Sequence, residues 1–67
     1  MLYIAYCYVG RGKREMRSGV HESHEAAARD LMQRLPDVTY VWTCKAFQDK
    51  PSGFDVRGYH RHTIMGG

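Results

Sequence analysis

The stretch Ser-His-Glu-Ala-Ala-Ala-Arg-Asp-Leu-Met-Gln-Arg-Leu at positions 23–35 decides the fold of this chain. Ser23 is a preferred N-cap residue, and Glu25 places an acid in the first turn, where the helix dipole favours it. The three alanines that follow have the highest helix propensity of any residue. Pro36 disfavours a helical Leu35 and therefore ends the element. The sequence predicts one helix over Ser23–Leu35.

The predicted helix is amphipathic. At about 100° per residue its apolar side chains form one stripe, which is the face expected to pack against the rest of the fold. The other side carries two i,i+4 charge pairs, Glu25 with Arg29 and Asp30 with Arg34, and is expected to face solvent. His24 falls within the stripe, so we expect a partly buried histidine with a local hydrogen bond. The stripe consists of Ala27, Ala28, Leu31, Met32 and Leu35.

A β-hairpin is predicted ahead of the helix. Leu2–Val9 is rich in tyrosine, β-branched and aliphatic residues and contains no breaker, which is typical of a strand. The Gly-Arg-Gly-Lys segment at 10–13 suits a tight turn. Arg14–Val20 has few apolar residues, so we expect it to return as an edge strand whose charges discourage pairing with other chains.

Two further strands are predicted after the helix. Val38–Gln48 is β-branched and aromatic and gives the strongest strand signal. A turn at 49–53 precedes a weaker strand at Phe54–Ile64, which Gly58 interrupts. Met65–Gly67 is expected to be a frayed tail. The 67 residues thus predict one α+β domain of β-β-α-β-β order, in which a small antiparallel sheet carries one amphipathic helix packed on one face.

The chain has more aromatic surface than one helix can cover. Both faces of the first and third predicted strands carry bulky side chains, so some of six aromatic residues should lie outside the main core. Exposed tyrosine and tryptophan near arginine are typical of binding hot spots. The last strand, the tail or a second copy of the chain would cover the same face equally well. The six residues are Tyr3, Tyr6, Tyr8, Tyr40, Trp42 and Phe47.

The positive charge of the chain is concentrated in one segment. Gly10–Arg17 contains four basic residues and one acidic residue, whereas the rest of the chain contains six of each and is neutral. This distribution favours a local anionic contact over a generally basic surface. The plainer interpretation is a solvated basic hairpin.

The residues that could carry chemistry do not form a catalytic or metal-binding set. Cys7 and Cys44 lie in apolar, strand-like runs and are expected to be buried free thiols, although a bridge between neighbouring strands stays open. The four histidines match no standard zinc spacing, and a chain this small has little room for a catalytic pocket. We therefore expect no cofactor, no metal and no enzymatic activity. The histidines are His21, His24, His60 and His62.

The sequence predicts a cytoplasmic protein. Met1–Val9 lacks the basic start of a secretory signal. No apolar run approaches the roughly 20 residues that a membrane helix needs, so no membrane partner is expected.

In size and element order the chain resembles the short inhibitors that phages and other mobile elements encode against host machinery, such as anti-CRISPR proteins and RNA polymerase inhibitors. This resemblance implies a small protein-interaction module that regulates or inhibits a larger protein or nucleoprotein complex. It rests on no shared motif and implies no residue roles. The aromatic surplus and the basic hairpin predict the partner-binding residues: Tyr6, Tyr8, Arg11, Lys13, Arg14, Arg17, Tyr40 and Trp42.

The alternative function is single-stranded nucleic-acid binding, with bases stacked on Tyr6 and Tyr8 and phosphates paired with the basic hairpin. Against it, the chain has no recognisable aromatic RNA-binding signature, and it lacks the second helix of an RNA-recognition or helix-turn-helix fold. A homodimer without another partner is the third reading that the sequence leaves open.

Overall fold

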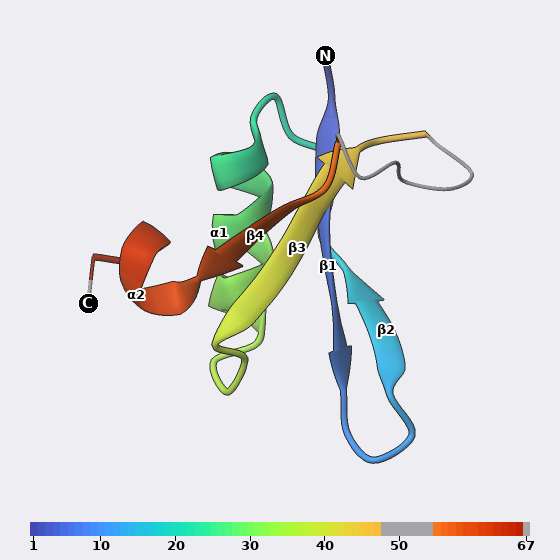
Figure 1. Cartoon of the computed structure of the whole chain (residues 1–67), viewed down its shortest axis with the longest axis vertical. Helices are drawn as coiled ribbons and strands as arrows, with labels where there is room; N and C mark the ends of the chain where they lie inside the picture. The colour runs from blue at the N-terminus through green and yellow to red at the C-terminus, as the bar shows by residue number, and fades with distance from the viewer. Residues whose placement is uncertain (48–54, 67) are drawn as a thin grey trace.

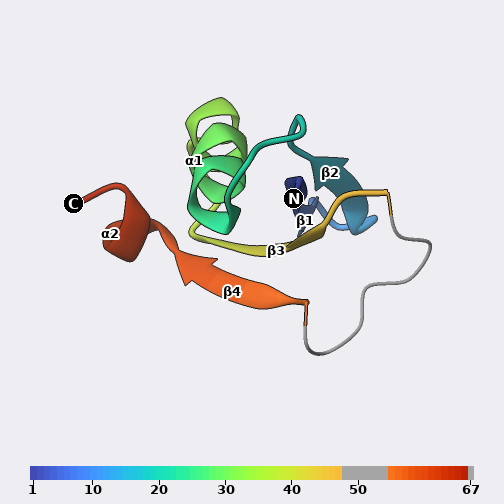
Figure 2. The same ribbon diagram turned by 90° about the horizontal axis from the view of Figure 1, so that it is seen from above.

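The computed structural model of the chain describes residues 1–47 and 55–66. Four antiparallel strands form one sheet in the order β2-β1-β3-β4, and the main helix packs across one face of it (Figures 1 and 2). The predicted α+β fold is confirmed, with a short second helix added at its end. The elements are β1 (Tyr3–Val9), β2 (Arg14–Arg17), α1 (His24–Arg34), β3 (Tyr40–Lys45), β4 (Arg57–His60) and α2 (Arg61–Ile64).

Helix α1 lies within the predicted range, one residue shorter at each end, with Ser23 as its N-cap and Leu35 as its C-cap. The Ser23 hydroxyl accepts a hydrogen bond from the Ala26 amide at 3.1 Å, and the Leu35 amide closes the helix by donating to Leu31 O at 3.0 Å. In the part of the chain that the structure describes, no helix is long and apolar enough to cross a membrane. The apolar stripe of α1 packs against the middle of the sheet. The buried core contains Ala5 and Cys7 from β1, Ala27, Ala28, Leu31 and Met32 from α1, Val41 from β3 and Ile64 from α2.

Strand β2 is shorter than the predicted Arg14–Val20 because Ser18 ends the ladder. The Ala5 amide donates to the Ser18 hydroxyl at 2.8 Å, and the Ser18 amide donates to Ala5 O at 2.8 Å. The Ala5 amide thus donates to the side chain of Ser18 instead of to a main-chain carbonyl, and the regular ladder between β1 and β2 stops there. The chain touches β1 again through a single bridge between Tyr3 and His21.

Strand β3 is also shorter than predicted, ending at Lys45 rather than at Gln48. Phe47 adopts a left-handed conformation with φ of 66° and is 84% exposed, so the chain has already turned away from the sheet there. Gln48 and the predicted turn at 49–53 lie outside the described residues.

The prediction of one strand over Phe54–Ile64 is wrong at its C-terminal end. Phe54 lies outside the described residues, β4 covers only Arg57–His60, and the chain then turns into α2. The helix forms because it carries Ile64 into the core, where only 5% of that residue stays exposed. Arg29, predicted to pair with Glu25, instead donates to Ile64 O at 3.1 Å and joins α2 to α1.

Arg61 connects the last turn of α1 to the loop before β3. Its guanidinium donates to Leu35 O at 2.7 Å, to Val38 O at 2.8 Å and to Met32 O at 3.0 Å. The last carbonyls of a helix have no partner within the helix and carry partial negative charge, so a cationic donor is favoured there. One side chain thus satisfies three carbonyls and holds α2 in place.

Replacing Arg61 with methionine keeps an unbranched side chain but removes all three hydrogen bonds. Because each hydrogen bond to a charged group contributes about 1.5–3 kcal/mol and part of that loss is recovered by water, we expect Arg61→Met to lower the free energy of unfolding by about 2–3 kcal/mol. Urea unfolding followed by far-ultraviolet circular dichroism measures this. The control is Arg11→Met in the exposed hairpin turn. Equal stability of the two variants would contradict the assigned role of Arg61.

Asp30 connects α1 to the segment that precedes it. Its carboxylate accepts hydrogen bonds from His21 Nε2 at 2.6 Å and from the Gly19 amide at 3.1 Å, and it forms the predicted ion pair with Arg34 at 2.9 Å. The hydrogen bond from His21 is the main cause that lowers the pKa of Asp30. Burial opposes the shift, and Gly19 and Arg34 add to it.

The lowered pKa of Asp30 predicts a loss of stability in acid. The folded carboxylate resists protonation more than the unfolded one, whose pKa is 3.8. Its contribution is therefore fully present above that pH and is lost as the pH falls through the lower folded pKa. We expect Asp30→Asn to be about 1–3 kcal/mol less stable than the native chain at pH 7, with the gap shrinking below pH 3.8. Asp37→Asn, at an exposed position, is the control in urea unfolding series. A gap that stays constant with pH would refute the assignment.

Candidate functional site

The sheet has a second face that α1 does not cover (Figure 2). Ala5, Cys7 and Val41 point toward α1, so alternate residues of the same strands point the other way. We call this second surface the open face. The strand register assigns to it Ile4, Tyr6 and Tyr8 of β1, Glu15 and Arg17 of β2, Tyr40, Trp42 and Cys44 of β3, and Gly58 and His60 of β4.

Five rings form a continuous aromatic row across the open face. Trp42 stacks on Tyr6 with centroids 6.1 Å apart and planes 23° apart, and its ring also lies 6.4 Å from Tyr8. Tyr40 meets Trp42 edge to face at 5.0 Å and continues to His60 at 4.6 Å. Such ring pairs contribute about 0.5–1.5 kcal/mol each beyond the area they bury, so the row is ordered before any partner arrives.

The aromatic row is partly accessible to a partner. Tyr8 is 54% exposed, while Tyr6, Tyr40 and Trp42 are half-buried against one another. Burial raises the pKa of Tyr6, and the nearby Cys44, Tyr8 and Glu15 raise it further. The Tyr6 hydroxyl therefore stays protonated and remains a hydrogen-bond donor.

Gly58, on β4, leaves space for the Tyr40 side chain of the aromatic row. The residue lies opposite Trp42 in the ladder. A β-carbon on Gly58 would lie 1.6 Å from the hydroxyl oxygen and 2.5 Å from Cζ of Tyr40. The Tyr40 ring thus lies directly over the glycine, and the residue that interrupts the strand pattern in the sequence has a packing role.

The basic hairpin lies at one end of the row. Arg17 is on the open face and pairs with Glu15 at 3.2 Å. Arg11 and Lys13 are exposed in the turn that follows β1. Arg14 stands opposite Val9, on the α1 side of the sheet. Of the predicted partner-binding residues, the structure brings Tyr6, Tyr8, Arg17, Tyr40 and Trp42 onto one face, places Arg11 and Lys13 at its end, and separates Arg14 from it.

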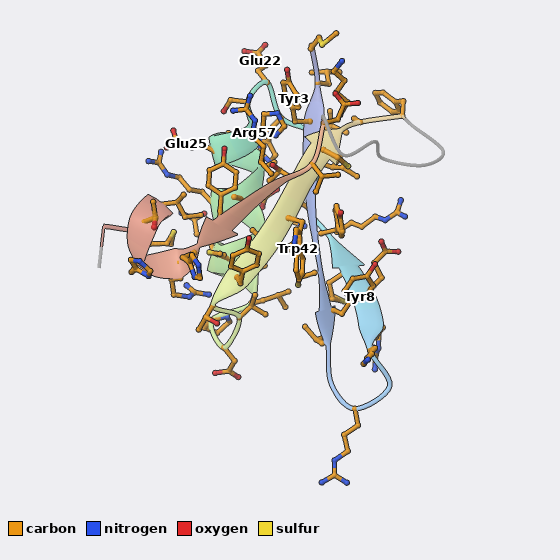
Figure 3. All side chains as sticks on the ribbon, viewed as in Figure 1. Tyr3, Tyr8, Glu22, Glu25, Trp42 and Arg57 are labelled. Carbon is orange, nitrogen blue, oxygen red and sulfur yellow. The ribbon has the colours of Figure 1, made fainter. Side chains whose placement is uncertain are left out.

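A cleft of about 510 Å³ lies beside the start of α1. Figure 3 shows Tyr3, Glu22, Glu25 and Arg57 gathered there, apart from Trp42 and Tyr8. Two carboxylates, one guanidinium and the N-terminus of a helix face the same space, so the cleft does not favour a ligand of one charge. Its lining residues are Tyr3, Glu22, Ser23, His24, Glu25, Arg57 and Tyr59.

His24 lies at this cleft and is half-buried, as predicted, but its hydrogen bond is not local. Nδ1 is hydrogen-bonded to Oγ1 of Thr43 on β3 at 2.7 Å, and the ring lies 4.1 Å from that of Tyr3. Burial lowers the pKa of His24, and the charge of Arg57 lowers it further. The neutral imidazole satisfies a buried threonine, which is a structural role. Sequence reasoning missed Arg57 and Tyr59 because only the β3–β4 register brings them to this helix.

Among residues 1–47 and 55–66, no group of three or more histidine, cysteine or acidic side chains could hold a metal ion. The rings of His60 and His62 are adjacent, with centroids 5.2 Å apart. They line a smaller cavity of about 310 Å³ with Thr39, Arg61 and Met65.

Cys7 and Cys44 are buried free thiols, as predicted. The register places Cys7 on the α1 side, opposite Met16, and Cys44 on the open face, opposite Ile4. Because they project from opposite faces of the sheet, they cannot form a bridge without rearranging it. Burial is the main cause that raises the pKa of each thiol.

Comparison with protein-family models, with curated proteins and with solved structures found no match in any of the three.

The contact between Gly58 and Tyr40 predicts a coupled pair of substitutions. Because the added β-carbon must push the Tyr40 ring off the row, we expect Gly58→Ala to destabilise the chain by about 1–3 kcal/mol. In a Tyr40→Ala background the same substitution should not lower the free energy of unfolding, since glycine is itself unfavourable within a strand. A double-mutant cycle in urea measures the coupling, with Gly12→Ala, whose β-carbon meets no atom within 4 Å, as control. If Gly58→Ala lowered the free energy of unfolding equally in both backgrounds, the position of the Tyr40 ring would not depend on Gly58.

Proposed function

We propose that this protein is an interaction module that docks on a larger protein or nucleoprotein complex through the open face and regulates or inhibits it. The observation that carries the proposal is the ordered aromatic row on a sheet face that the helix leaves uncovered. Tyr8 is 54% exposed within the row, and tyrosine, tryptophan and arginine dominate binding hot spots.

The size of the open face suits a specific contact. In Figure 1 the molecule is viewed down its shortest axis, and its two longer dimensions are 29 and 27 Å. The rectangle that encloses this view of the whole molecule measures roughly 800 Å², about the area that each protein contributes to a standard interface, and the open face occupies part of it. A domain this small has one such face to offer, which suits a protein that acts by blocking a site on something larger.

The ring geometry favours a protein partner over single-stranded nucleic acid. Trp42 already contacts the rings of Tyr6, Tyr8 and Tyr40, whereas a base-stacking platform presents separate rings with free faces beside a groove that follows the phosphates. Among the described residues, the unpaired hairpin cations Arg11 and Lys13 lie at one end of the row rather than along it. The same reasoning supports a binding protein over an enzyme, since the row presents contact surface and no acid–base set.

Size and element order support an inhibitor of the kind that phages and other mobile elements encode. Two buried free thiols support a cytoplasmic location, because thiols stay reduced there.

The row predicts which substitutions abolish docking. We expect a tagged native chain to retain a stoichiometric partner from a lysate of its source organism, and we expect Tyr8→Ser/Trp42→Ser to lose that partner by about 30-fold, the effect of one hot spot of 2 kcal/mol. Phe47→Ser is the matched control, because Phe47 is an exposed aromatic residue outside the strands. Circular dichroism confirms that each variant is folded. A partner retained equally by all three baits would contradict docking through the row.

Binding of nucleic acid would give a different result. Short single-stranded oligonucleotides would then bind the native chain in fluorescence anisotropy at low salt, with an affinity that falls steeply as salt rises. Such binding, together with the absence of a protein partner, would replace the present proposal.

A further inference from the structure

The cationic side chains of this protein differ in whether they form ion pairs or hydrogen bonds within the folded chain. Arg61 donates to three carbonyls and Arg29 to one, while Arg34 and Lys45 each pair with a carboxylate. These side chains stabilise the folded chain through contacts within it. Most of the positive charge outside the hairpin is therefore already balanced or hydrogen-bonded.

Apart from Arg17, which pairs with Glu15, the hairpin cations differ from these. Within the described part of the chain, the side chains of Arg11, Lys13 and Arg14 form no ion pair and no hydrogen bond. All three are exposed, and the segment that contains them carries the whole net charge of +3. In Figure 1 the turn between β1 and β2 projects away from the rest of the molecule.

The free cations begin where the aromatic row ends. Tyr8, the most exposed ring of the row, stands opposite Glu15, and the next pair of the ladder is Val9 with Arg14. A partner that covers Tyr8 and Trp42 would therefore reach the turn with its adjoining surface. The contact surface is apolar and aromatic across β1 and β3 and cationic at the hairpin.

A second copy of the chain does not complement this surface. Glu15 is the one carboxylate that the register of the described strands places on the open face, and Arg17 already engages it. In a face-to-face pair, each hairpin would therefore meet no free carboxylate on the described strands of the other copy. Like charges that face each other across an interface disfavour it.

We infer that the partner is a protein whose docking surface is apolar where it covers the aromatic row and acidic where it meets the hairpin turn. This inference rests on the proposed function and specifies the partner's chemistry. Carboxylates on the partner would form charge-assisted hydrogen bonds with Arg11 and Lys13, while Arg14, on the α1 side of the sheet, adds to the positive charge of the turn. They would also speed association, because complementary charge steers the encounter.

The test is a selection from a displayed library of random peptides of about 12 residues, long enough to span the row and the turn. The full chain is immobilised in four forms: native, Tyr8→Ser/Trp42→Ser, Arg11→Gln/Lys13→Gln/Arg14→Gln, and Arg57→Gln. Arg57 is the matched control, since it is an exposed cation without an ion pair in the described chain but lies at the cleft rather than at the hairpin.

We expect the native chain to enrich peptides that join aspartate or glutamate to aromatic or aliphatic residues. Their affinity should fall by about tenfold or more for the triple hairpin variant and with a rise from about 50 to about 500 mM salt. It should fall for Tyr8→Ser/Trp42→Ser and stay unchanged for Arg57→Gln.

Two results separate failure of this inference from failure of the proposed function. Peptides that need Tyr8 and Trp42 but show no acidic enrichment, or that bind the triple variant equally well, would overturn the acidic partner and leave docking through the row intact. The hairpin charges would then only protect the sheet edge. A selection in which no peptide depends on Tyr8 and Trp42 would overturn both, as would concentration-dependent dimerisation through the open face in sedimentation.

Discussion

A single helix of eleven residues can cover only one face of a four-stranded sheet, and the rest of this structure follows from that limit. Ala27 and Ala28 are small enough to let α1 approach the sheet closely, and Leu31 and Met32 fill the space above β1 and β3. The apolar side chains of the opposite face have no helix to pack against. They pack laterally instead, ring against ring from Tyr8 to His60, and the result is an ordered surface rather than a core.

The charged residues divide in the same way. Arg61, Arg29 and the Asp30–His21 pair join segments that hydrophobic contact alone would hold weakly, because a domain of 67 residues buries a small core. Arg61 matters most among them, since it completes the end of α1 and places α2 at once. Among the described residues, three of the cations that remain, Arg11, Lys13 and Arg14, are grouped in the hairpin at the end of the aromatic row. The hairpin cations therefore lie outside the set of residues that stabilise the fold, so they can vary with little loss of stability.

Some features could be predicted because their signals are local. The cap at Ser23, the alanine run and Pro36 define α1 within a few residues, and the glycines at 10 and 12 mark the turn. The end of β4 could not be predicted from the sequence. Residues 61–64 form a helix because Arg61 donates to carbonyls at the end of α1 and Ile64 packs in the core. The truncation of β2 by Ser18 likewise depends on a bond to Ala5, 13 residues earlier.

By itself, the sequence determined the number and order of the main elements, the buried face of α1 and the existence of an aromatic and basic surplus, because these depend on periodicity and composition. Only the tertiary structure decided which surplus residues share a surface. Strand register turned Arg14 away from the aromatics, set Tyr40 over Gly58 and brought Arg57 to the start of α1. The physical reason is that side chains alternate along a strand, so a shift of one residue in pairing would exchange the two faces, and the pairing is fixed by contacts between residues far apart in the chain.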